Sequence, residues 1–305
     1  MTPQSSQKTK WYLVRIQLDE PISEHRWDLF TVLANDVGSE GNQDFLSGEL
    51  IEGADFYFDS SKVESALAVS SLKDLLLRIK ITNAAFSVLD VDPLNWIQTG
   101  KRFYEAKSIT DQFVVGPQEE RTSFATQDVH YISIEYGAAF GTGSHPTTVL
   151  CMQLLQRQIR PNITILDFGT GTGVLSFAAL YLGAAFAFCV DCSDDAELIF
   201  RRNAEDNRMI DSVYFHLGSN PRDVIPLADR LGKDLPKLIL CNMLLSDSEN
   251  LLTELREFNA PMIYSGYLED QSVVVRLSLE QAGFNIVHEQ FSENWGACTC
   301  EPKAI

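Results

Sequence analysis

Hydrophobic positions in the second half of the chain form short unbroken runs that alternate with longer stretches of helical spacing. The runs have strand length: ITILDF (163–168), AFAFCVD (185–191), VYFHL, KLILCN and APMIYSG. Between the first two runs, VLSFAALYLGA (174–184) has apolar residues at helical spacing and ends at Gly183. DDAELIFRRNAEDNR (194–208) is an amphipathic helix pattern with acids before arginines, as the helix dipole favours. This alternation predicts an α/β domain with a mostly parallel, doubly wound sheet.

The first half of the chain predicts a smaller α+β domain. WYLVRIQL (11–18) has a strand pattern, and SSKVESALAVSSLKDLLLRI (60–79) has helical spacing. The chain has 305 residues, so two domains are expected rather than one core. We assign residues 1–94 to the α+β domain, 95–134 to a linker and 135–305 to the α/β domain.

A glycine-rich turn, Asp167-Phe-Gly169-Thr-Gly171-Thr-Gly173, lies between a predicted strand and a predicted helix. Glycines allow a sharp turn and a close approach to a ligand because no Cβ intervenes. The turn lacks the lysine of a Walker phosphate loop, and its glycine spacing differs from that of the dinucleotide fingerprint. The G-x-G-x-G form resembles the first motif of class I methyltransferases, whose ligand, S-adenosylmethionine, carries no phosphate.

Two polar residues end later strands, at the edge where an open α/β sheet binds its ligands. Asp191 follows Gly173 by 18 residues and can accept hydrogen bonds from both hydroxyls of a ribose, which NAD and S-adenosylmethionine share. Asn242 ends the run LILC and supplies an acceptor and two donors, which suits a polar amine or carboxylate. The run Asn-Pro-Pro-Tyr, typical of enzymes that methylate amide or base amino groups, is absent from the sequence.

Net charge, apolar runs and cysteine spacing limit which partners, which location and which metal content we expect. A net charge of −18 disfavours direct nucleic-acid binding and favours attraction of a basic protein. The sequence has no run of 18 apolar residues, so we expect no membrane span. The six cysteines lack the paired spacing of a zinc site, and most sit in apolar runs as reduced thiols do. We therefore expect a cytoplasmic protein without a metal.

The segment 137–148, GAAFGTGSHPTT, extends the resemblance from a fold class to one family. Together with the glycine turn, it resembles the PrmA family of ribosomal protein methyltransferases, whose signature is Ala-Phe-Gly-Thr-Gly followed by His-Pro-Thr-Thr. The resemblance covers residues 134–300 and includes Asn-Met-Leu (242–244), Ser-Gly-Tyr-Leu (265–268) and Glu-Asn-Trp (293–295). The sequence departs from the family pattern at 135–138, Glu-Tyr-Gly-Ala, and at 191–194, Asp-Cys-Ser-Asp.

This resemblance implies a fold, a cofactor and a substrate. The fold is the class I methyltransferase fold with a seven-stranded sheet, and the cofactor is S-adenosylmethionine. The substrate is a large-subunit ribosomal protein, L11, methylated on lysine or N-terminal amino groups and held by domain 1–94. Phe140 and the turn at 141–143 are implied to fold over the cofactor as a flap. The implied catalytic residue is Asn242, and the implied cofactor-binding residues are Phe140, Thr142, Thr148, Asp167, Gly169, Gly171, Gly173, Asp191 and Asn242.

Three other functions stay open at this point. The chain could be a lysine methyltransferase for another protein client, which intact-mass measurement of candidate substrates would identify. It could be a non-catalytic cofactor-binding scaffold, because the sequence departs from the family pattern around Glu135 and Ser193. A nicotinamide oxidoreductase would share the ribose-binding Asp191, and an NADH titration would separate it from a methyltransferase.

Overall fold

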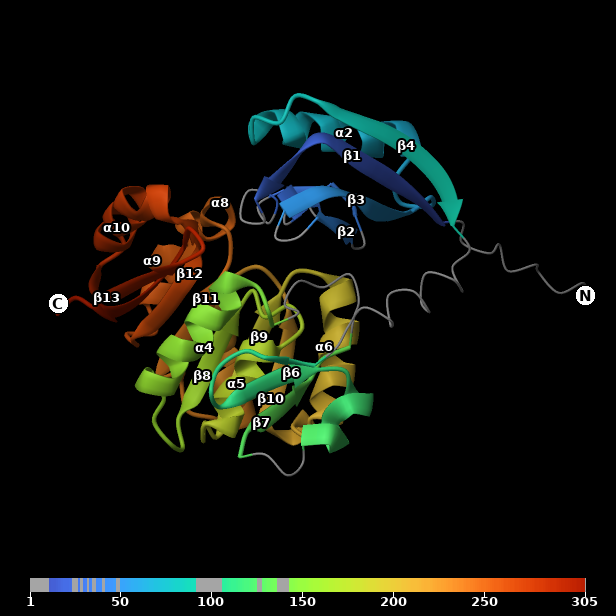
Figure 1. Cartoon of the computed structure of the whole chain (residues 1–305). Helices are drawn as coiled ribbons and strands as arrows, with labels where there is room; N and C mark the ends of the chain where they lie inside the picture. Colours follow the sequence, from blue (N-terminus) through green and yellow to red (C-terminus); the bar gives the residue numbers. More distant parts are fainter. Residues whose placement is uncertain are drawn as a thin grey trace, which may run out of the picture. The chain divides into compact units, whose positions relative to one another are not determined.

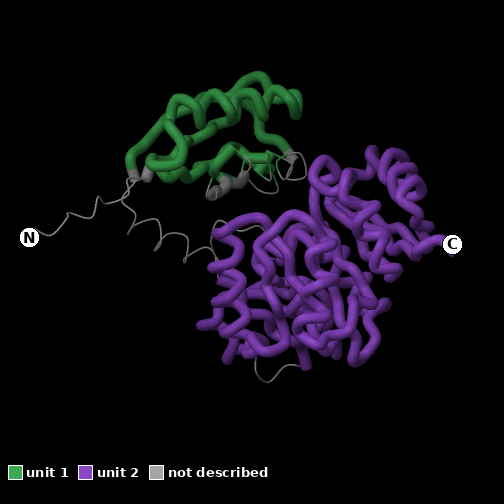
Figure 2. The backbone as a smooth tube through the Cα atoms, turned by 180° about the vertical axis from the view of Figure 1, so that it is seen from behind, with its two compact units in different colours: residues 1–103 green, residues 104–305 purple. Residues whose placement is uncertain are grey.

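The chain folds into two units, residues 1–103 and 104–305, which are coloured separately in Figure 2. We describe each unit by itself. The structure is a computed structural model that describes residues 11–23, 27, 30, 31, 33, 34, 37–39, 42–47, 50–91, 106–124, 128–135 and 143–304.

The smaller unit is built on a four-stranded antiparallel sheet in the order β2-β3-β1-β4. Its elements are β1 (Trp11–Ser23), β2 (Asn42–Ser47), β3 (Leu50–Asp59), α2 (Ser65–Arg78) and β4 (Ala84–Val91). Alternate residues such as Val14 and Ile16 of β1 pack against Leu72 of α2 in one apolar core. The predicted smaller α+β domain is therefore confirmed.

The larger unit begins with a small three-stranded sheet in the order β5-β6-β7. It comprises β5 (Lys107–Ser108), β6 (Phe113–Gly116), the 3-10 helix η1 (Gln118–Phe124) and β7 (His130–Ser133). Sequence analysis treats this stretch as part of a linker, whereas the structure builds strands there. Strands of two and four residues are too short to produce a period-two pattern that a sequence reading can detect.

The main sheet of the larger unit has seven strands in the order β10-β9-β8-β11-β12-β14-β13 (Figure 1). The first five strands in this order are parallel, and β14 and β13 join antiparallel at the edge. The predicted mostly parallel seven-stranded sheet is confirmed. Its strands are β8 (Thr164–Phe168), β9 (Phe186–Asp191), β10 (Val213–Leu217), β11 (Leu238–Asn242), β12 (Met262–Leu268), β13 (Phe284–Ser292) and β14 (Trp295–Pro302).

Helices cover both faces of this sheet, as a doubly wound fold requires. Leu166 and Phe168 of β8 share an apolar core with α7, α9 and α10. Asp167, between them, points to the opposite face and accepts a hydrogen bond from Ser176 of α5. The helices are α4 (Pro146–Gln158), α5 (Val174–Tyr181), α6 (Asp194–Asp206), α7 (Val224–Leu231), α8 (Leu245–Ser248), α9 (Leu252–Arg256) and α10 (Ser272–Gln281). Four 3-10 turns lie between them: η2 (Ile210–Ser212), η3 (Pro221–Asp223), η4 (Glu249–Leu251) and η5 (Glu269–Gln271).

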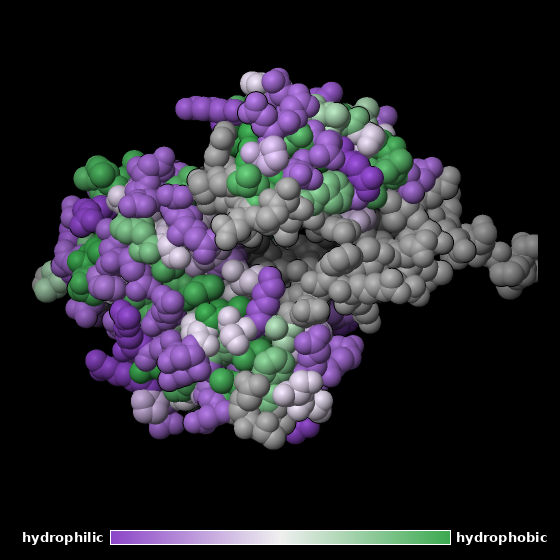
Figure 3. All heavy atoms as spheres, viewed as in Figure 1, coloured by the Kyte–Doolittle hydropathy of each residue, from purple (hydrophilic) through white to green (hydrophobic). Residues whose placement is uncertain are grey.

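In the face drawn in Figure 3, hydrophilic residues cover much of the larger unit, with hydrophobic residues scattered between them. Within the described part of the chain, no helix combines the length and apolar character needed to cross a bilayer.

Candidate functional site

The candidate site lies at the carboxyl ends of three adjacent parallel strands, β9, β8 and β11. The glycine turn at 169–173 follows β8, Asp191 is the last residue of β9, and Asn242 is the last residue of β11. Because β8 lies between the other two strands, these features share one edge of the sheet. After β8, the chain forms β9 and β10 on one side of that strand and then crosses to form β11 and β12 on the other side. Open α/β sheets form a ligand crevice where the chain changes sides in this way.

Three glycines of the turn have backbone conformations that other residues rarely adopt. Gly169, Gly171 and Gly173 have φ angles of 75°, 52° and 86°. A Cβ on Gly173 would lie 2.7 Å from Phe200 and 2.8 Å from Phe177, so this position also lacks room for a side chain. Glycine is therefore required both by the turn's left-handed backbone and by the packing of α6 against α5.

The main chain of β9 and the Asp191 carboxylate hold this turn in place. The carbonyl of Val190 accepts hydrogen bonds from the amides of Gly169 and Thr170, at 2.8 and 3.1 Å. Asp191 Oδ2 accepts from the amide of Gly171 at 2.9 Å. The turn is thus fixed before any ligand arrives, which lowers the entropy lost on binding.

Asp191 remains half-buried and keeps acceptor capacity for a ligand. Its Oδ1 accepts from the amide of Ser193 at 3.0 Å, and each carboxylate oxygen has a further lone pair. The N-cap of α6 is Ser193, whose hydroxyl accepts from the amide of Ala196 at 3.3 Å. Asp191 is therefore not the residue that caps this helix.

Asp167 lies beneath the turn and supports it. The side chain is 1% exposed, and its Oδ2 accepts hydrogen bonds from Thr170 Oγ1 at 2.8 Å and Ser176 Oγ at 2.6 Å. Burial raises the pKa of Asp167 from 3.8 to about 6, although these hydrogen bonds oppose the shift. The structure therefore places Asp167 where it braces the backbone of the turn.

The side chain of Asn242 is half-buried, and it makes no hydrogen bond within the described part of the chain. The next residue, Met243, donates its backbone N–H to the carbonyl of Ser265 at 3.3 Å. Gly266 permits this close approach, since a Cβ there would lie 2.1 Å from the carbonyl oxygen of Met243. Sequence reasoning used Gly266 as part of a family pattern and missed this packing role.

The first turn of α4 supplies a buried hydroxyl and a neutral histidine. Thr148 is 1% exposed, and its Oγ1 has no hydrogen-bond partner among the described residues. His145 is the N-cap of α4 and accepts from the amide of Thr147 through Nδ1 at 3.3 Å. Burial lowers the pKa of His145 to about 4, so its ring is neutral near pH 7.

Two predicted site residues lie outside the described part of the chain. These are Phe140 and Thr142, on which the predicted flap depends. The structure brings the remaining predicted residues to one edge of the sheet or, for Thr148, to the start of the adjoining helix α4.

Sequence reasoning missed Asn203, which contacts the glycine turn. Asn203 is 0% exposed, and its Nδ2 donates to the carbonyl of Thr172 at 2.9 Å. A signal was present: on α6, Asn203 falls on the same face as Ile199 and Phe200, so a polar side chain interrupts an apolar stripe.

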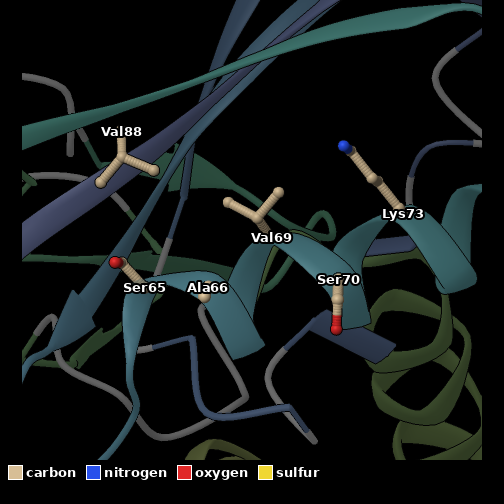
Figure 4. A pocket seen from close by; sticks show the side chains of 6 residues that line it. All are labelled: Ser65, Ala66, Val69, Ser70, Lys73 and Val88. Carbon is tan, nitrogen blue, oxygen red and sulfur yellow. The ribbon is translucent and has the colours of Figure 1, made fainter.

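A shallow pocket in the smaller unit does not resemble a catalytic site. It lies between α2 and β4 and is lined by Ser65, Ala66, Val69, Ser70, Lys73 and Val88 (Figure 4). Its one charged group, the Lys73 ammonium, lies 5.1 Å from the centre of the Phe86 ring. The lining therefore offers no paired groups for acid–base or nucleophilic chemistry.

Comparisons with known proteins identify one family. A family model described as Ribosomal protein L11 methyltransferase (PrmA) matches residues 40–303. A Bacillus pumilus protein named ribosomal protein L11 methyltransferase is 31% identical over 224 residues, covering 72% of this chain and 70% of that protein. A Macrococcus caseolyticus protein of the same name is 28% identical over 247 residues, covering 81% and 77%.

A solved structure supports the fold. The crystal structure of a ribosomal protein L11 methylase from Lactobacillus delbrueckii subsp. bulgaricus superposes with a TM-score of 0.58. It is 24% identical and covers 66% of this chain and all of the other chain.

Asp167 predicts a specific dependence of stability on pH. Its pKa is higher in the folded protein than the unfolded value of 3.8, so between about pH 4 and 6 the folded state retains a proton that the unfolded chain has released. The free energy of unfolding contributed by this group therefore falls as the pH rises, by about 2–3 kcal/mol in all. Asp167→Asn removes the titration and keeps a hydrogen-bond acceptor.

Urea unfolding of both proteins from pH 4 to 7 measures this effect. We expect the unfolding free energy of the wild type, minus that of Asp167→Asn, to decrease across this range. A difference that stays constant with pH would contradict the raised pKa of the buried Asp167.

The glycine turn predicts a second difference in stability. Gly173→Ala is expected to lower the unfolding free energy by about 2–4 kcal/mol, from left-handed backbone strain and overpacking against Phe200. Gly232→Ala is the matched control, because Gly232 has a φ of 60° and nothing lies within 4 Å of its Cβ position. That control is expected to lose about 1 kcal/mol in urea unfolding; equal losses would show that packing does not require a glycine at 173.

Proposed function

The chain belongs to the ribosomal protein L11 methyltransferase family and is an enzyme that uses S-adenosylmethionine, and we propose that it methylates amino groups of ribosomal protein L11. The observation that carries the proposal is the meeting of the glycine turn, Asp191 and Asn242 at one edge of the sheet. The substrate is the one printed in the names of the relatives, and the lysine and N-terminal amino groups are the targets that the family resemblance implies.

The residues at this edge fit the cofactor. Asp191 keeps acceptor capacity for the ribose hydroxyls. Gly169 and Gly171 adopt the left-handed backbone that the turn needs, and the side chain of Met243 lies 2.5 Å from where a Cβ of Gly169 would be. The buried Thr148 hydroxyl, which lacks a partner among the described residues, is a further group available to the ligand. Phe140 and Thr142 complete the proposed set on the strength of the family resemblance alone.

Asn242 is the residue that we assign to the reacting amine. Its side-chain amide lies at the end of β11 and makes no hydrogen bond to the described residues. The amide oxygen can accept a hydrogen bond from a neutral amine and so orient the nitrogen lone pair. When bound, S-adenosylmethionine supplies a methyl group already activated by the positive sulfur. The protein therefore needs to position the amine and exclude water rather than to activate the donor.

The target amine must lose its proton before it can attack. A lysine with a pKa of about 10.4 requires roughly 4–5 kcal/mol for deprotonation at pH 7, whereas an α-amino group with a pKa of about 7.7–8.0 requires little. A desolvated pocket lowers an amine's pKa and supplies part of this energy. His145 has its Nδ1 engaged in capping α4, so we assign it a structural role and no part in proton removal.

The charge of the chain suits a basic protein substrate. A net charge of −18 attracts a basic protein over long range and raises the rate of encounter. This attraction weakens with salt, so encounter is expected to slow as ionic strength rises.

Methyl transfer to purified ribosomal protein L11 tests the proposed function. We expect labelled methyl groups to pass from S-adenosylmethionine to the ribosomal protein. Asp191→Asn is expected to reduce transfer at least tenfold, because an amide nitrogen replaces one of the two oxygens that face Gly171 and the ribose. Asp211→Asn is the matched control, since Asp211 is exposed in η2, before the amino end of β10 and therefore at the opposite edge of the sheet.

The outcomes separate the candidate functions. Transfer to another basic protein but not to L11 would identify a methyltransferase with a different client. Cofactor binding without transfer to any basic protein would favour a scaffold. Equal activity of the two aspartate variants would overturn the role given to Asp191.

A further inference from the structure

Helix α6 contacts the glycine turn at two places along its length. Phe200 packs where a Cβ of Gly173 would be, and Asn203 donates to the carbonyl of Thr172. Asn203 is 0% exposed, and a buried amide needs good hydrogen bonds to offset the loss of water.

Asn203 also contacts a second segment. Its Oδ1 accepts a hydrogen bond at 2.6 Å from the backbone amide of Glu135, 68 residues earlier in the chain. One side chain thus joins the peptide of Thr172, in the turn, to the end of the segment that contains β7. The Glu135 side chain adds an ion pair with Arg202 on the same helix, at 3.1 Å.

The turn needs this contact because its glycines permit alternatives. The peptide between Thr172 and Gly173 can rotate through coupled changes of ψ and φ, and Gly173 has no Cβ to resist that rotation. Two hydrogen bonds oppose this rotation. Asn203 Nδ2 donates to the carbonyl oxygen of this peptide, and the backbone N–H of Gly173 donates to the carbonyl of Thr170 at 2.9 Å. Losing the first removes a hydrogen bond from the Thr172 carbonyl and favours other arrangements of the turn.

We propose that Asn203 is a positioning residue that holds the glycine turn in its cofactor-binding conformation and ties that turn to the chain at Glu135. This inference rests on the proposed function, because it concerns the binding of S-adenosylmethionine at the turn. Asn203 acts through the backbone of Thr172 and has no assigned contact with the cofactor.

Asn207 provides a matched control on the same helix face. It is 4% exposed, and its amide pairs with the backbone of Ser133, donating at 2.7 Å and accepting at 2.9 Å, while its Nδ2 also donates to the backbone carbonyl of Asn203 at 2.8 Å. It therefore resembles Asn203 in burial, in residue type and in its contact with the β7 segment. The structure gives Asn207 no hydrogen bond to residues 169–173.

The test compares cofactor binding and stability for the variants Asn203→Ala, Asn203→Asp and Asn207→Ala. Calorimetry with S-adenosylhomocysteine as the probe gives Kd, and thermal unfolding gives Tm. We expect both Asn203 variants to weaken binding at least tenfold, while Asn207→Ala lowers Tm and changes Kd less than threefold. Asn203→Asp preserves the acceptor for the Glu135 amide but faces the Thr172 carbonyl with a carboxylate, so it isolates the contact with the turn.

Amide hydrogen exchange provides a readout that needs no ligand. In the Asn203 variants the amides of residues 171 and 173 should exchange faster, and in Asn207→Ala they should match the wild type. Glu135→Ala removes the ion pair with Arg202 but keeps the backbone N–H, so its Kd should stay unchanged. With labelled substrates, the Asn203 variants should raise KM for S-adenosylmethionine more than they lower kcat.

The possible failures are distinguishable. If the wild type does not bind S-adenosylhomocysteine, the proposed function fails. If the wild type binds and the Asn203 and Asn207 variants lose affinity equally, the proposed role of Asn203 fails. If Asn203→Ala does not fold, Asn203→Asp decides, because it keeps the size and one hydrogen bond of the native residue.

Discussion

The site depends on the hydrogen bond between the Asp191 carboxylate and the backbone amide of Gly171, at 2.9 Å. This contact connects the end of β9 to the turn that follows β8, and these strands pair in parallel. A glycine turn alone would have many conformations, since each of its three glycines tolerates backbone angles that other residues avoid. The carboxylate limits that freedom, and because Asp191 is half-buried it remains accessible to a ligand. The Asp191 side chain therefore holds the backbone of the turn and also offers a ligand a hydrogen-bond acceptor.

Helix α6 adds a second contact that holds the turn. Ser193, two residues after Asp191, is the N-cap of this helix, and Asn203, near its carboxyl end, donates a hydrogen bond to the carbonyl of Thr172 in the turn. Sequence reasoning identified Ser193 as a departure from the family pattern, and the structure gives the serine a hydrogen bond to the amide of Ala196. Asp167 supports the turn from below, where burial keeps its pKa high. The turn is thus held from the side and from beneath.

Much of the fold was predictable because its signals are local. The runs 163–168 and 185–191 read as buried strands, the three glycines of the turn follow one strand directly, and Asp191 and Asn242 end two others. The rest depends on contacts between distant parts of the chain. Asn203 and Asn207 find partners 68 and 74 residues away, which no period in the sequence encodes. Strands β5 to β7 have two to four residues, too few for a pattern.

A crystal structure of this chain with S-adenosylhomocysteine tests the central claim most directly. The account predicts that the ribose hydroxyls lie within hydrogen-bonding distance of the Asp191 carboxylate and that the nucleoside rests against the glycine turn. The backbone of residues 169–173 should keep its conformation, because the protein already fixes it. A nucleoside bound elsewhere on the chain, or a turn that rearranges to admit it, would contradict the account.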